Sequence, residues 1–179
     1  MAEIVDLGQH RRQMEARRGF QGWNKRFEES FDENTRIEDL SDSVLWTLIQ
    51  GGNDSSLLLY ELIMGVEGLG PGPRFYSLEP SLRMAVMDTA LFLLDQLRFE
   101  AMKRLRWAED LPSFHIPLVD LINNIDEDYN PFKAMVPILS STHPGYVDYA
   151  GTFEPDRGRF IRKLIPEALE AFQKRVNPE

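Results

Sequence analysis

The chain has 179 residues, a formal net charge of −9 and no cysteine. This length is typical of one domain, or of one domain with an arm. The lack of cysteine excludes disulfides, thiolate metal sites and cysteine nucleophiles, and the acidic balance does not favour a nucleic-acid partner. The N-terminal residues contain no apolar signal segment, and no apolar stretch could span a bilayer. We therefore expect a soluble, cytoplasmic protein.

Charge is unevenly distributed along the N-terminal part of the chain. Residues 10–27 contain six basic side chains and one acidic side chain, whereas residues 28–42 contain seven acidic side chains and one basic side chain. Such blocks of opposite charge are typical of a segment distinct from the packed body. We therefore expect an N-terminal arm over residues 1–35 and a single helical domain over residues 36–179.

Four aromatic residues in this arm are spaced three or four positions apart and would form one stripe on a helix. They are Phe20, Trp23, Phe27 and Phe31. One interpretation is that the stripe packs on the chain's own core. The other is that it docks into a groove on a second subunit or on a protein partner. The four residues are therefore our partner-binding candidates.

Apolar residues in the body recur at helical spacing, and no segment shows sustained period-two alternation, so we predict an all-α, irregular helical bundle. The first helix is predicted over residues 42–50, with Ser41 as its N-cap. A second helix is predicted from a cap at Asn53 or Asp54 to about Gly65. A glycine- and proline-rich segment follows it.

A long central helix is predicted over residues 80–107, and its middle, residues 84–94, is apolar nearly all round. Such a helix is buried either at the centre of a bundle or against a second subunit. Further helices are predicted over residues 117–124, 131–139 and 159–176, and Pro166 should kink or split the last one.

The known motifs of catalysis and metal binding do not occur in this sequence. The Glu-x-x-His pairs of di-iron bundles, the phosphate-binding loop and the Gly-x-Ser-x-Gly elbow are all missing. Residues 126–130 begin like a calcium loop, but Pro131 and Pro137 stand where glycine and glutamate are required. Residues 43–64 imitate a helix-turn-helix, yet the second helix is acidic, which opposes binding to nucleic acid. The sequence therefore identifies no metal site and no cofactor.

Two carboxylates on the central helix are the best internal candidates for a site. Asp88 and Asp95 lie seven residues apart, which places them on one helix face about 10 Å from each other. Burial would raise a carboxylate pKa and create an acid or base, but pairing with arginine or a subunit interface is the simpler explanation of the two residues. Glu61 and His143 complete the set of ligand-binding candidates.

No specific function is evident from these patterns. We expect a non-catalytic interaction or regulatory protein that acts as a homo-oligomer, most simply a homodimer. The alternative is an enzyme, or a binder of a small ligand or divalent metal, with an acidic pocket between helices near Asp88 and Asp95.

Overall fold

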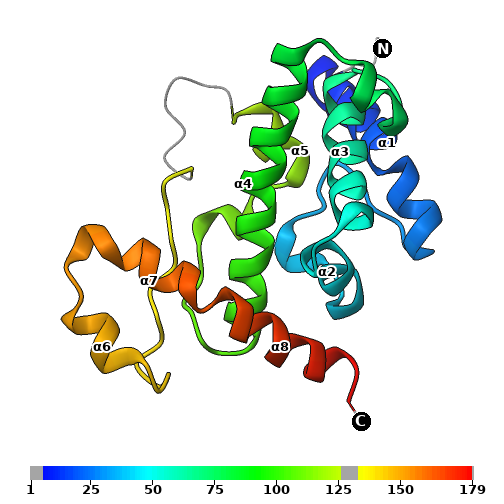
Figure 1. Cartoon of the computed structure of the whole chain (residues 1–179). Helices are drawn as coiled ribbons and strands as arrows, with labels where there is room; N and C mark the ends of the chain where they lie inside the picture. The colour runs from blue at the N-terminus through cyan, green and yellow to red at the C-terminus, as the bar shows by residue number, and fades with distance from the viewer. Residues whose placement is uncertain (1–5, 126–132, 179) are drawn as a thin grey trace.

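In the computed structural model, which describes residues 6–125 and 133–178, the chain forms an all-α helical bundle (Figure 1). This confirms the predicted fold class. The long helix α4 (Pro80–Arg104) runs through the middle of the molecule. α3 (Asn53–Glu67) packs on α4, and α1 (Leu7–Phe27) packs on α3. The other α-helices are α2 (Asp42–Ile49), α5 (Leu118–Asn123), α6 (Tyr146–Gly151), α7 (Arg157–Lys163) and α8 (Ile165–Val176).

Short 3-10 turns connect several of these helices, and none of the described residues belongs to a β-strand. The turns are η1 (Ile37–Asp39), η2 (Gly72–Ser77), η3 (Pro112–His115) and η4 (Glu154–Asp156). Within the described residues, no helix is both long enough and apolar enough to cross a membrane.

Of the two predicted N-caps, the one of α2 is confirmed and the one of α3 is wrong. The Ser41 hydroxyl accepts a hydrogen bond from the Val44 N–H at 3.3 Å, so Ser41 caps α2 as predicted. The predicted cap of α3 is wrong, because Asn53 is already its first helical residue and Gly52 holds the cap position. Gly52 has φ 96°, a conformation that favours glycine over every residue with a side chain.

α3 continues past Gly65 to Glu67, two residues beyond the predicted end. Gly65 lies where α1 and α3 touch backbone to backbone. A Cβ atom at Gly65 would stand 2.5 Å from the carbonyl oxygen of Arg18, and one at Gly19 would stand 2.8 Å from Val66 Cγ2. Glycine at these positions therefore sets the close approach of the two helices.

α4 supplies one side of the hydrophobic core and ends earlier than predicted. Arg106 adopts a left-handed conformation (φ 63°), which turns the chain away soon after Arg104. The buried apolar side chains of α4 are Val86, Ala90, Phe92, Leu93, Leu97, Phe99, Ala101 and Met102.

The C-terminal region splits as the sequence predicted. α7 ends at Lys163 and α8 begins at Ile165, with Pro166 in the first turn of α8, where its missing N–H has no helical partner. The helix predicted over residues 131–139 is wrong for residues 133–139, which form turns and extended chain. Its start and the calcium-like residues 126–130 lie outside the described residues.

Candidate interaction surface

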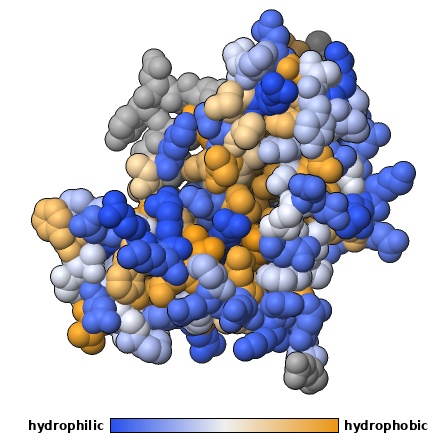
Figure 2. Space-filling model, viewed as in Figure 1, coloured by the Kyte–Doolittle hydropathy of each residue, from blue (hydrophilic) through white to orange (hydrophobic). Residues whose placement is uncertain are grey.

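A line of large apolar side chains on α4 is exposed. Met84, Met87 and Leu91 have exposed fractions of 57%, 37% and 60%, and Leu94 is half-buried. Their spacing of three, four and three residues places them on one face of the helix. Figure 2 shows apolar atoms running down the middle of this side of the molecule, where Figure 1 places α4. We call these four residues the α4 stripe.

The stripe is open because α7 and α8 cover only the C-terminal end of α4. Met102 lies five turns beyond Met84 on the same helix face, yet it is fully buried. α8 packs against α4, and the guanidinium of Arg162 on α7 lies 5.9 Å from the ring centre of Phe99. The sequence predicted that residues 84–94 are apolar nearly all round. The chain's own helices cover the face that carries the α4 stripe only at the C-terminal end of α4.

Charged side chains border the stripe on both edges. Helical geometry places Arg83 on one edge and Asp88 on the other. Arg83 donates one long hydrogen bond, of 3.4 Å, to the carbonyl oxygen of Tyr76. Asp88 is exposed and makes no ion pair with any described residue. Arg98 lies one turn beyond Leu94, and burial of its guanidinium lowers its pKa.

The structure does not bring the four ligand-binding candidates together. Asp88 is exposed on α4, whereas Asp95 accepts a hydrogen bond from Arg162 at 3.2 Å. His143 packs against Trp107, with 4.9 Å between the ring centres, and accepts a hydrogen bond from the backbone of its own turn. Across residues 6–125 and 133–178, no three metal-ligating side chains come close enough to hold an ion.

Glu61, the fourth candidate, lines a cavity of about 490 Å³ between α1 and α3. Its side chain packs against Gly22 and Gly72. The lining combines apolar side chains with charges of both signs. The lining residues are Gly22, Lys25, Arg26, Asp54, Leu57, Leu58 and Glu61. Asp88 and Asp95 are not among them.

The aromatic stripe of the N-terminal arm lies in the interior. Phe20 and Trp23 are fully buried, Phe31 is nearly so, and Phe27 packs at the edge of the core. Neighbouring rings lie 5.4 to 6.2 Å apart, and the Trp23 indole N–H donates to the Leu58 carbonyl at 2.9 Å. The stripe therefore packs on the chain's own core, which is the first of the two interpretations. Docking of these rings to a partner remains a prediction.

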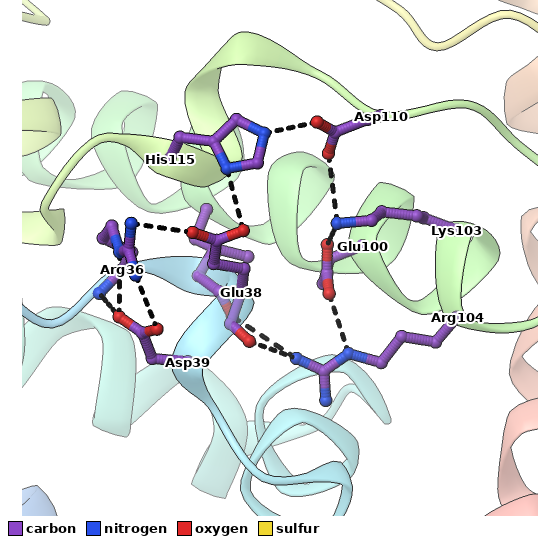
Figure 3. A network of polar contacts seen from close by, with 9 residues as sticks. Arg36, Glu38, Asp39, Glu100, Lys103, Arg104, Asp110 and His115 are labelled. Carbon is purple, nitrogen blue, oxygen red and sulfur yellow. Dashed lines mark hydrogen bonds and ion pairs between the residues drawn. The ribbon is translucent and has the colours of Figure 1, made fainter.

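A network of ion pairs joins η1, η3 and the C-terminal end of α4 (Figure 3). The imidazole of His115 lies between two carboxylates, with Nδ1 2.8 Å from Glu38 and Nε2 against Asp110. Lys103 bonds Asp110 at 3.1 Å. Arg104 bonds the buried carboxylate of Glu100 at 2.8 Å. Arg104 therefore neutralises a charge that burial would otherwise penalise.

The two carboxylates favour the charged form of His115. Hydrogen bonds to Asp110 and then to Glu38 raise the pKa of its imidazole above the usual value of 6.5. Because both ring nitrogens face carboxylate oxygens, the ring donates at both positions only when it is protonated. The side chain of His115 is 45% exposed. Neither carboxylate was predicted as its partner.

Other ion pairs link segments that are far apart in the sequence. Arg12 on α1 forms a two-pronged pair with Asp120 on α5, with both distances at 2.9 Å. Arg104 and Arg175 both bond Asp42 at 2.8 Å, which ties α2 to α4 and α8. These long-range pairs have no local signal in the sequence, whereas Glu100–Arg104 and Arg11–Glu15 have the four-residue spacing of a helical ion pair.

Comparison with known proteins adds no further information about this chain. No protein-family model matches it, and searches of curated proteins and of solved structures also find no match. The functional argument therefore depends on the geometry of the chain itself.

Proposed function

We propose that this protein is a non-catalytic interaction or regulatory protein of the cytoplasm that acts as a homo-oligomer, most simply a homodimer. The observation that carries the proposal is the α4 stripe, in which Met84, Met87 and Leu91 are exposed side by side. Single exposed apolar residues are ordinary on a protein surface, but a contiguous group of them is typical of an interaction site.

The placement of the shifted ionisable groups also favours this proposal. Two groups whose pKa values move, His115 and Asp39, bond charged neighbours on the surface. Hydrogen bonds from Arg36 lower the pKa of Asp39, and carboxylates raise that of His115. Structural ion pairs shift pKa values without any chemical reaction. These shifts therefore need no catalytic explanation.

Sedimentation equilibrium of the full-length chain tests the proposal. We expect the average mass to rise with concentration from the 20.7 kDa of one chain toward twice that value. Leu91→Glu places a charge in the stripe and should keep the protein monomeric. Phe153→Glu is the matched control, because Phe153 is 73% exposed but lies outside α4. A wild-type chain that stays monomeric at every concentration contradicts the proposal.

A further inference from the structure

The α4 stripe has the spacing of a coiled-coil heptad. Met84 and Leu91 are seven residues apart, and Met87 and Leu94 repeat the same interval three residues later. In heptad notation the first pair occupies the a positions and the second pair the d positions. Two such faces bury each other by packing side chains of one helix between those of the other. The geometry of the stripe therefore matches a second helix with the same pattern.

The charges beside the stripe select the direction of that second helix. Arg83 occupies the flanking g position and Asp88 the flanking e position. In a parallel pair, each g residue faces the e residue that is five positions further along the partner helix. Arg83 would then face Asp88 of the second copy, and two-fold symmetry would form this ion pair twice.

An antiparallel arrangement of the same stripe is less favourable. It brings like flanks together, so that Asp88 of one copy would approach Asp88 of the other, and like charges repel. Arg83 would then lose its acidic partner.

Two neighbouring residues limit the contact to about three turns of helix. Asp95, the next e position, already bonds Arg162. Arg98, the next a position, would face its own copy in a parallel pair, and its guanidinium is half-buried. The contact therefore runs from Arg83 to Leu94 and ends before Arg98.

We propose that a second copy of this chain docks on the α4 stripe in a parallel, in-register arrangement fixed by Arg83 and Asp88. This inference rests on the proposed homo-oligomer and specifies its interface. Stable interfaces bury about 1,200 Å² or more, and three helical turns bury less. The dissociation constant of the dimer should therefore be on the order of micromolar or higher, so that the dimer dissociates on dilution below that concentration.

Charge exchange tests the ion pair. Arg83→Glu and Asp88→Arg should each raise the dissociation constant about fivefold or more, since attraction becomes repulsion at two symmetric places. The double variant should restore the wild-type constant. Glu170→Arg is the control for Asp88→Arg, because it makes the same charge change at an exposed position on α8. Sedimentation equilibrium measures the constants, and circular dichroism checks that each variant is folded.

Single-cysteine crosslinking tests the direction, because the natural chain contains no cysteine. In a parallel, in-register pair the a-position residue Met84 meets its own copy, so Met84→Cys should form a disulfide-linked dimer on mild oxidation. In an antiparallel pair Met84 faces Leu94, and Met84→Cys alone should not crosslink efficiently. Phe153→Cys is the exposed control.

The outcomes separate this inference from the proposed function. A wild-type chain that is always monomeric overturns both. A wild-type dimer that neither single charge variant weakens overturns the inference alone, and so does a dimer in which Met84→Cys crosslinks no better than the control. Weakening by both single variants, restoration by the double variant and crosslinking through Met84→Cys support the parallel pair.

Discussion

His115 connects η3, on which it lies, to η1 through Glu38 and to the segment after α4 through Asp110. Asp110 is also bonded by Lys103, and Glu38 by Arg36, so both carboxylates carry a second cation. Only the protonated ring donates to both carboxylates at once, which makes this double contact dependent on pH.

His115→Gln should lose stability mainly at acidic to neutral pH. The folded pKa of His115 lies above its unfolded value, so its stabilisation is fully present below about pH 6.5 and is lost as pH rises through the folded pKa. The difference in melting temperature between wild type and variant should therefore be largest near pH 6 and shrink toward about pH 9. A constant difference across this range would contradict the account. Glu38→Gln removes one of the two carboxylates that raise the pKa of His115. It should therefore also weaken the contribution of His115 to stability at acidic to neutral pH.

A second prediction at the scale of one residue concerns the stability of a Gly65 variant. Gly65→Ala places a methyl group against the Arg18 backbone, which cannot move away cheaply, and should lower the free energy of unfolding by about 1–3 kcal/mol. Gly151→Ala is the control, since nothing lies within 4 Å of the added carbon. Urea unfolding measures both variants. Equal effects at the two positions would show that the helix contact is not as close as described.

Among the helices, α1 depends most clearly on its aromatic cluster. Trp23→Ala removes a fully buried ring and leaves the Leu58 carbonyl without its indole donor. We expect a loss of about 3–5 kcal/mol in the free energy of unfolding. Phe153→Ala, at an exposed ring, should change it by less than about 0.5 kcal/mol. Denaturant unfolding measures the free energy of unfolding of both variants. If the two variants lose the same amount, α1 is only loosely attached to the core and the prediction is wrong.

Local rules predicted several helices well. Ser41 marked the start of α2, and Pro166 marked the division between α7 and α8, because capping and the missing proline N–H act within one turn. The end of α3 was predicted too early, at Gly65. This glycine does not end the helix but allows close contact with α1, which is remote in the sequence. α6 was not predicted either, since its six residues follow a proline and a glycine that favour a turn.

At the scale of the whole molecule, the sequence indicated the kind of surface but not its place. The sequence showed that residues 84–94 are apolar nearly all round. Which side of this segment is exposed depends on the positions of α7 and α8, which only the folded chain shows. The ion pairs Arg12–Asp120 and Arg104–Asp42 join helices that only the folded chain brings together. For Asp88 and Asp95 the sequence left a shared pocket and pairing with arginine as alternatives, and the structure pairs Asp95 with Arg162, which is distant in the sequence.

Native mass spectrometry of the purified full-length chain distinguishes a homodimer from a ligand-bound monomer, because it reports stoichiometry and retained small molecules together. We expect a population with the mass of two chains and no added mass, which falls on dilution and is lost in Leu91→Glu. A monomer that carries a reproducible excess mass would contradict this expectation. That result would favour instead the alternative of a ligand or metal held between the helices.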